Sequence, residues 1–160
     1  MSDGADITIR DARADDLPAI IAMIADDQLG RTRDDASIPL DARYTRAFEA
    51  IERDPGNRLL VAERNGRVVG TLQLTFIPGL ARTGAWRGQI EAVRIARDER
   101  GGGLGRRLMD WAIETCRARG CTLVQLTSDR ARPEAHRFYE SIGFVASHEG
   151  FKLAIDVTGT

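Results

Sequence analysis

A glycine run bounded by arginines is the feature of this sequence that most directly suggests chemistry. The segment reads Arg100, Gly101, Gly102, Gly103, Leu104, Gly105, Arg106 and Arg107. Without side chains in the turn, backbone N–H groups can approach a ligand closely. Leu104, Leu108 and Ala112 then follow at helical spacing, so unpaired N–H groups and the positive end of a helix dipole should lie at the same point. The segment therefore predicts a binding site for phosphate groups, with the arginines adding positive charge around it.

Two other phosphate-binding motifs are excluded by their spacing. A dinucleotide fingerprint, Gly-x-Gly-x-x-Gly, would end at Arg106 if it began at Gly101, and at Leu108 if it began at Gly103. A P-loop ends in Gly-Lys-Ser/Thr, and the sequence contains no such triplet. The pattern that does fit is Arg-x-x-Gly-x-Gly, and the segment 90–108 resembles the acetyl-coenzyme A motif of the GNAT acetyltransferases.

A second segment supports this resemblance independently. Residues 135–144 read Ala-His-Arg-Phe-Tyr-Glu-Ser-Ile-Gly-Phe and are similar to the family's Ala-x-x-Phe-Tyr-x-x-x-Gly-Phe helix. The resemblance is specific mainly from Arg87 to Phe151. It implies an enzyme that passes acetyl directly from acetyl-coenzyme A to a primary amine of a small molecule. A peptide or protein amine remains open as the acceptor, and so does a coenzyme A-binding sensor module without turnover.

The resemblance implies catalytic roles for Tyr139 and Glu91. A phenol has a pKa of about 10 and a thiol about 8.5, so Tyr139 could protonate the leaving thiolate as general acid; alternatively it packs beside Phe138. Glu91 could act as the base that removes the amine proton, directly or through water, if burial raises its pKa. By strand alternation it should share a face with Val93 and Ile95; the alternative is a structural ion pair with an arginine.

Coenzyme binding is expected from backbone and side chains of both motifs. In this family the strand carrying Glu91 splays from its neighbour at a bulge, and the pantetheine arm lies along its backbone. The resemblance assigns coenzyme binding to Val93, Arg94, Ile95, Arg100, Gly101, Gly102, Gly103, Leu104, Gly105, Arg106, Phe138 and Tyr139. Arg132 stands where many members have Asn, so the resemblance does not extend to that contact. No metal is expected.

Composition limits the other possibilities. A chain of 160 residues with 42% hydrophobic residues fits one domain, residues 1–160, with a real core. The net charge of −1 gives no electrostatic footprint for nucleic acid or an anionic membrane. The first six residues lack the pattern of a signal peptide, so a cytoplasmic location is expected. Cys116 and Cys121 are expected to be small buried hydrophobes. A homodimer is possible in this family.

The elements that must position these residues follow from periodicity and turn signals. Strands are predicted over 7–10, 58–63, 67–76, 89–96, 122–127, 144–147 and 151–155. Helices are predicted over 17–24, 40–53, 103–119 and 133–142. Their order favours an α/β (α+β) architecture, a mixed and mostly antiparallel sheet of six to seven strands with about four helices on its faces, which is also the GNAT fold. The loops 28–37, 77–88 and 147–150 are expected to shape the acceptor site.

Overall fold

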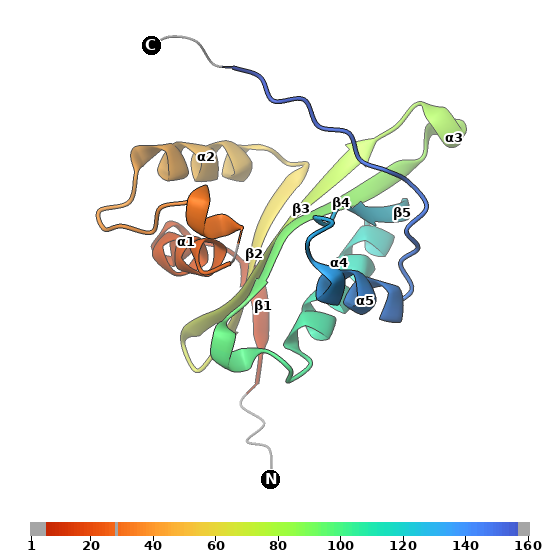
Figure 1. Cartoon of the computed structure of the whole chain (residues 1–160). Helices are drawn as coiled ribbons and strands as arrows, with labels where there is room; N and C mark the ends of the chain where they lie inside the picture. Colours follow the sequence, from red (N-terminus) through yellow and green to blue (C-terminus); the bar gives the residue numbers. More distant parts are fainter. Residues whose placement is uncertain (1–5, 28, 157–160) are drawn as a thin grey trace. The chain divides into compact units, whose positions relative to one another are not determined.

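The computed structural model describes residues 6–27 and 29–156, and these form two compact units that meet between Leu126 and Thr127 (Figure 1). Each unit is described by itself below. The expectation that the protein is cytoplasmic depends partly on its first five residues, which lie outside the described residues. The same holds for Gln28 of the predicted 28–37 loop. None of the described helices is long and apolar enough to cross a membrane.

The N-terminal unit is a five-stranded sheet in the order β1-β2-β3-β4-β5. Its strands are β1 (Thr8–Asp11), β2 (Asn57–Arg64), β3 (Arg67–Pro78), β4 (Trp86–Ile95) and β5 (Cys121–Leu126). The first four strands are antiparallel to their neighbours, whereas β5 runs parallel to β4. The predicted mixed, mostly antiparallel sheet is therefore confirmed, with five strands rather than six to seven.

Helices cover both faces of this sheet. The main helices are α1 (Leu17–Ala25), α2 (Ala42–Arg53) and α4 (Leu104–Ala118), and the short ones are η1 (Ala14–Asp16), η2 (Gly30–Thr32), α3 (Ala81–Gly84) and η3 (Arg97–Glu99). Helices α1 and α2 lie on one face and α4 lies on the other (Figure 1). Leu104, Leu108 and Ala112 of α4 are all buried, as their helical spacing predicts. The N-terminus of α4 is therefore fixed by the packing of Leu104 in the core.

The β2–β3 hairpin follows its sequence signal. Asn65 and Gly66 form the two-residue turn between the paired residues Arg64 and Arg67, with φ values of 51° and 75°. Positive φ at both positions is what a type I′ turn requires, and Asn-Gly supplies it at low cost. This hairpin aligns β3 with β2 and so sets the register of the central strands.

The predicted connection over 77–88 is shorter in the structure, because the strands on either side take residues 77–78 and 86–88. Strand β3 continues to Pro78 and β4 begins at Trp86, leaving only a short turn that contains α3. Gly88 suggested a loop, but it lies in β4, where a Cβ atom would stand 2.3 Å from Sγ of Cys116 in α4. Glycine is needed here so that the helix can pack closely on the strand.

The C-terminal unit contains α5 (Pro133–Ser141) and an extended segment after it. Pro133 starts this helix and Gly143 follows its end with φ of 101°, as the sequence predicts. The strands predicted over 144–147 and 151–155 are not formed, and Phe151, Leu153 and Ile155 are exposed. Alternation shows which face a strand would bury, but it supplies no partner strand for the backbone hydrogen bonds.

Candidate functional site

The free edge of β4 is the first part of the candidate site. Strand β4 pairs with β5 only as far as Ile90, opposite Leu126, but it pairs with β3 as far as Ile95, opposite Gly70. Within residues 6–126, the other edge of β4 therefore has no strand partner from Glu91 to Ile95. Backbone N–H and C=O groups on such an edge can receive an extended ligand as an added strand.

A β-bulge opens this edge. Two residues of β4, Ala92 and Val93, occupy the space opposite the single residue Leu72 of β3. Ala92 has φ of 52°, a left-handed conformation that costs a non-glycine residue about 1–3 kcal/mol. Such strain persists where the surrounding structure imposes it, and it concentrates at functional sites. The bulge agrees with what the family resemblance implies, although nothing in the residue type of Ala92 indicates it.

The bulge also corrects the predicted orientation of Glu91. Glu91 pairs with Gln73 and so shares the sheet face that α1 and α2 cover, whereas Ile95 pairs with Gly70 on the face that α4 covers. Glu91 therefore does not share a face with Ile95, because the extra residue shifts the alternation between them. Glu91 is exposed, and the ion pairs found among the described residues do not include it.

The glycine loop lies between η3 and α4. Gly101 and Gly103 have φ of 81° and 82°, and a Cβ atom on either would have no neighbour within 4 Å. Backbone conformation, and not lack of space, is thus the reason for glycine at both positions. Gly103 caps α4 without any side-chain hydrogen bond to the first turn. The first turn of an α-helix has N–H groups without intrahelical partners, so the predicted phosphate site at this point stays a prediction.

Two of the three arginines around the loop make local contacts. Nε of Arg100 donates a hydrogen bond to the carbonyl oxygen of Ile95 at 3.1 Å, which places its guanidinium beside the free edge of β4. Arg106 pairs with Asp110 one turn further along α4, with 3.0 Å between Nε and Oδ1. Both side chains are exposed, so both can exchange these partners for a ligand.

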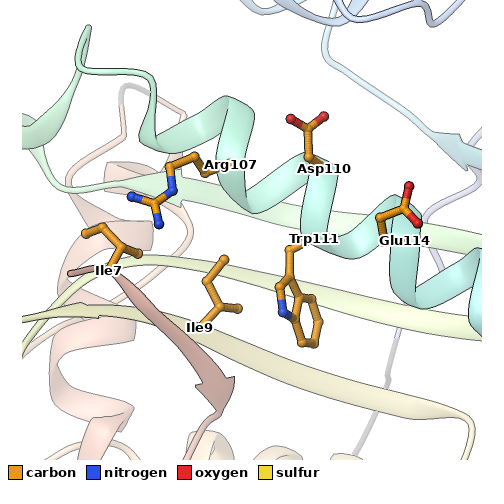
Figure 2. A pocket seen from close by; sticks show the side chains of 6 residues that line it. All are labelled: Ile7, Ile9, Arg107, Asp110, Trp111 and Glu114. Carbon is orange, nitrogen blue, oxygen red and sulfur yellow. The ribbon is translucent and has the colours of Figure 1, made fainter.

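Arg107 lies elsewhere. Figure 2 shows it directed towards Ile7 and Ile9, beside Trp111 in a groove of about 470 Å³ between β1 and α4. The prediction that Arg107 adds charge around the glycine loop is therefore wrong. One helical position separates Arg106 from Arg107, and a rotation of about 100° directs the two side chains to different surfaces.

Arg94 joins β4 to α1 beside the bulge. Its Nη2 lies 3.2 Å from Oδ2 of Asp27, and both side chains are only 15% exposed. Its Nη1 also donates to the carbonyl oxygen of Val93 at 2.8 Å. The structure thus gives Arg94 a role in holding the two elements together, and its predicted contact with the coenzyme stays a prediction.

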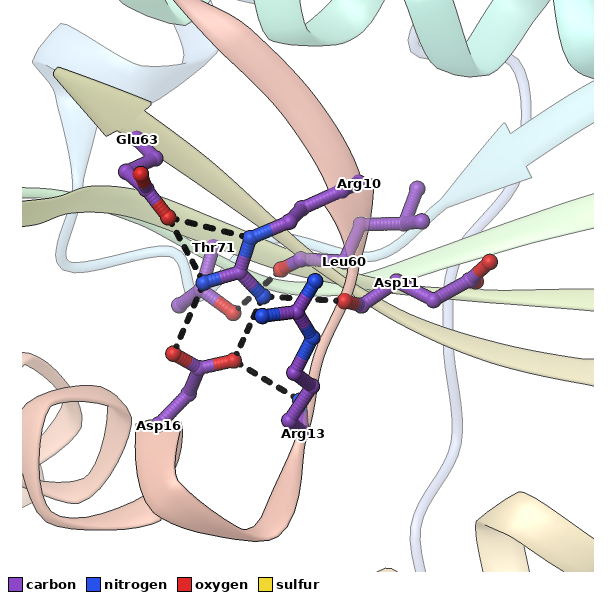
Figure 3. Close-up of polar contacts among 7 residues, drawn as sticks. All are labelled: Arg10, Asp11, Arg13, Asp16, Leu60, Glu63 and Thr71. Atoms are coloured by element: carbon purple, nitrogen blue, oxygen red, sulfur yellow. Dashed lines mark hydrogen bonds and ion pairs between the residues drawn. The ribbon is translucent and has the colours of Figure 1, made fainter. Parts of the chain in front are cut away.

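An ion-pair network holds the start of α1 against the sheet (Figure 3). Nη1 and Nη2 of Arg10 in β1 donate to the two oxygens of Asp16 at 2.7 and 3.0 Å, and Nη2 also donates to Oε2 of Glu63 at 2.7 Å. Asp16 further accepts the backbone N–H of Arg13 at 2.7 Å. The hydrogen bond from Arg10 lowers the pKa of Asp16 and raises that of Arg10.

A cavity of about 150 Å³ lies on the Glu91 face of the sheet, between α1, α2 and the strands. Tyr44, Ala47, Phe48 and Ile51 line it from α2 at helical spacing, and Gln73 and Ala92 line it from the sheet. The Tyr44 hydroxyl accepts the N–H of Asp35 at 2.9 Å and donates to Asp34 at 3.1 Å, and burial raises its pKa.

The sequence analysis missed this cavity. Glu91 itself does not line the cavity, but its strand partner Gln73 and its neighbour Ala92 do. The helical pattern identified the α2 residues as one face, but Gln73 has no distinguishing signal in a strand otherwise rich in apolar residues.

Tyr139 is held by the end of α5. The N–H groups of Gly143 and Phe144 donate to the carbonyl oxygens of Glu140 and Tyr139 at 3.1 and 3.0 Å, which is the Schellman pattern. The Tyr139 ring packs 6.0 Å from Phe144 and 5.3 Å from Phe138. The Tyr-x-x-x-Gly-Phe spacing thus sets the ring's position within its own unit. The coenzyme contacts expected of Phe138 and Tyr139 stay predictions.

Both histidines of the chain have local partners. His136 Nε2 lies 2.8 Å from the carbonyl oxygen of Asp129, and His148 Nδ1 lies 2.7 Å from Oγ of Ser147. Burial raises the pKa of the Cys116 thiol to about 12, so it is not a thiolate at neutral pH. Cys116 is buried as predicted, whereas Cys121 is only half-buried.

Comparison with known proteins gives consistent matches. The sequence model of the Acetyltransferase (GNAT) family matches residues 21–144. The aminoalkylphosphonate N-acetyltransferase of Salmonella typhimurium is 35% identical over 68% of this chain and 70% of its own length. The glucosamine 6-phosphate N-acetyltransferase of Trypanosoma brucei brucei is 37% identical over 55% of this chain and 58% of its own length. A crystal structure of a transcriptional regulator from Bacillus halodurans C-125 has a TM-score of 0.91 and 49% identity, covering 94% of this chain and 100% of that chain.

Proposed function

Because this chain belongs to the GNAT family of acetyltransferases, we propose that it transfers acetyl directly from acetyl-coenzyme A to the primary amine of a small molecule. The observation that carries the proposal is the free edge of β4, which opens at the bulge of Ala92 and leads to the glycine loop. An extended pantetheine arm fits the edge as an added strand, and the pyrophosphate fits the N-terminus of α4.

The proposed chemistry needs three groups. Glu91 takes a proton from the amine, directly or through water, because only the neutral amine attacks the thioester. A backbone N–H on the free edge of β4 donates to the developing oxyanion. Tyr139 returns a proton to the leaving thiolate, so that coenzyme A departs as the thiol. Acetyl passes from sulfur to nitrogen without a covalent enzyme intermediate.

The proposed acceptor is a small amine with a phosphorus oxyanion. The two relatives named above are an aminoalkylphosphonate and a glucosamine 6-phosphate acetyltransferase, and both acceptor names combine an amine with such a group. The cavity lined by Gln73 and Ala92 is largely apolar, with Tyr44, Thr71 and Gln73 as its polar residues, which suits the carbon skeleton of a small acceptor. Exposed Arg31 and Arg33 belong to the neighbouring loop and could meet the anion.

A second candidate function is a coenzyme A-binding sensor without turnover. The observation that favours it is the 49% identity to a structure described as a transcriptional regulator. This candidate keeps the free edge and the glycine loop but makes no use of Glu91. Turnover separates it from the first proposal, whereas binding does not.

The first test is calorimetric titration with acetyl-coenzyme A. Wild-type protein should bind one equivalent, and Gly103→Ala should bind it several-fold more weakly, because alanine at φ of 82° displaces the loop. Gly66→Ala is the matched control, since Gly66 has φ of 75° and equally open surroundings but lies in the β2–β3 turn. No binding by folded wild-type protein would contradict the proposal.

The second test measures thiol release with matched amines. Aminoethylphosphonate is compared with ethanolamine, and glucosamine 6-phosphate with glucosamine, so that each pair differs mainly in the anionic group. The proposal expects turnover with a higher kcat/KM for the anionic member. Turnover only with peptide amines would favour a protein acceptor, and saturable binding without any turnover would favour the sensor.

A further inference from the structure

The end of α1 contacts two arginines: Arg100 beside the glycine loop, and Arg97 in η3 just before that loop. Helix α1 ends at Ala25, and the next two residues are Asp26 and Asp27. Arg97 Nη2 lies 2.7 Å from Oδ1 of Asp26, and Arg100 Nη2 lies 3.9 Å from Oδ2 of the same carboxylate. Carboxylates oppose the dipole at a helix C-terminus, so α1 itself gains nothing from Asp26. The favourable contacts of Asp26 are therefore those with Arg97 of η3 and with Arg100 beside the glycine loop.

The two aspartates differ in their surroundings. The side chains of Asp27 and Arg94 are both 15% exposed, so that pair is a fixed link between α1 and β4. The side chain of Asp26 is 37% exposed, and its partners Arg97 and Arg100 are 68% and 50% exposed. Exposed ion pairs contribute only about 0–1 kcal/mol, so Arg97 and Arg100 can leave Asp26 at little cost.

Arg100 is also bound to the edge that the coenzyme is proposed to use. Its Nε donates to the carbonyl oxygen of Ile95 at 3.1 Å, on the strand segment that lacks a second strand partner. In the free protein, the side chain of Arg100 thus lies along β4 towards Asp26. A pyrophosphate at the glycine loop presents more negative charge than one carboxylate and can bind a guanidinium with two parallel hydrogen bonds.

We propose that Asp26 is an internal competitor of the coenzyme: it holds Arg97 and Arg100 in the free protein, and the phosphate groups of coenzyme A take these arginines from it on binding. The inference rests on the proposed function, because it concerns the same loop. Asp26 lowers the affinity for coenzyme A and assists release of the product coenzyme. It is a positioning residue for the two arginines and takes no part in the acetyl transfer.

The test compares coenzyme A with pantetheine, which lacks the phosphate groups. Asp26→Asn should lower the Kd for coenzyme A about two- to fivefold, the range expected when weak exposed ion pairs no longer compete. The Kd for pantetheine should stay unchanged, and Asp26→Glu should restore wild-type affinity for coenzyme A. A merely structural role of Asp26 would change both ligands together.

Asp98→Asn is the control for net charge. Asp98 lies between Arg97 and Arg100 in the sequence, but its partner is Arg67, at 2.6 Å. This variant removes the same charge from the same region and should leave the Kd for coenzyme A near wild type. Equal tightening by Asp98→Asn, or no tightening by Asp26→Asn, would overturn the competition while coenzyme binding by the wild type still supports the proposed function. Failure of the wild type to bind coenzyme A would overturn both.

Discussion

Glu91 is a carboxylate whose surroundings differ from those that strand alternation suggests. It stands on the face covered by α1 and α2, next to the strained Ala92, and it is exposed. We expect Glu91→Gln to reduce kcat/KM most at pH values below the pKa of the amine, because protonated amine then dominates and needs a base. The measurement is a pH profile of both proteins. Glu114→Gln, on an exposed face of α4, should leave the profile unchanged.

The outcome that contradicts a base role for Glu91 is a loss that does not vary with pH. Such a loss would mean that the side chain positions a substrate and does not take its proton. Because Glu91 is exposed, it can act as a base only on an amine that is held within hydrogen-bond distance of it.

Tyr139 contributes a ring and a hydroxyl that can be separated by mutation. The ring packs on Phe138 and Phe144, contacts that phenylalanine keeps. We expect Tyr139→Phe to lose about 10²–10⁴-fold in kcat, the usual size of a general-acid contribution, while binding acetyl-coenzyme A as the wild type does. Steady-state kinetics and calorimetry measure the two effects. Unchanged turnover would remove the general-acid assignment.

At the scale of elements, the contact between α4 and β4 sets where the glycine loop lies. A Cβ atom at Gly88 would stand 2.3 Å from Sγ of Cys116, so Gly88→Ala must push the helix from the strand. We expect a loss of about 1–3 kcal/mol in the free energy of unfolding, measured by chemical denaturation. Because Cys116→Ala frees that space, the double variant should lose less than the sum of the two single losses. Additive losses would contradict the direct contact.

The β-bulge at Ala92 is the second feature of the elements that shapes the site. Strand β4 has ten residues, and its pairing with β3 continues past the point where pairing with β5 stops. One extra residue at Ala92 turns Glu91 towards the helices α1 and α2 and leaves Val93 and Ile95 at the free edge. The same strand can therefore serve a proposed acceptor on one face and a proposed coenzyme along its edge.

For the whole molecule, the Arg10 network connects β1 and the start of α1 with Glu63, which is 53 residues further along the chain. Asp16 is buried, and its hydrogen bond from Arg10 holds its pKa below the usual value. The charged carboxylate is therefore favoured in the folded state, and its contribution to stability is present above the ordinary pKa of about 4 and disappears as the pH falls through the lower, folded-state pKa. We expect the stability difference between wild type and Asp16→Asn to shrink over that acidic window.

At neutral pH, Asp16→Asn should lower the free energy of unfolding by about 2–3 kcal/mol, because it weakens charge-assisted hydrogen bonds in a buried place. Asp11→Asn is the control, since its ion pair with Arg58 is largely exposed and should contribute at most about 1 kcal/mol. Denaturation curves at several pH values measure both. A constant difference between Asp16→Asn and wild type across the acidic range would contradict the link to ionisation.

Local residue patterns were enough to predict several turns and helices and the resemblance to the family. Positive φ values occur in the glycine loop, in the Asn65-Gly66 turn and at the Gly143 cap. Few residue types other than Gly and Asn adopt positive φ, so these features could be predicted from the local sequence. The apolar spacing of α4 also predicted its buried face. These signals are local because a turn or a helix turn is stabilised mainly by residues within four positions of each other.

Tertiary structure alone decided the features that depend on a partner. The bulge at Ala92 depends on pairing with β3, where one residue lies opposite two residues of β4, and no residue type in β4 indicates it. Gly88 indicated a loop, but it lies in β4 against α4. Arg107 was expected to add charge around the glycine loop, but its side chain lies beside β1. The segment 151–155 alternates like a strand but has no ladder. Register, close packing and side-chain pairing depend on residues far away in sequence, and the local pattern carries no information about where those residues will lie.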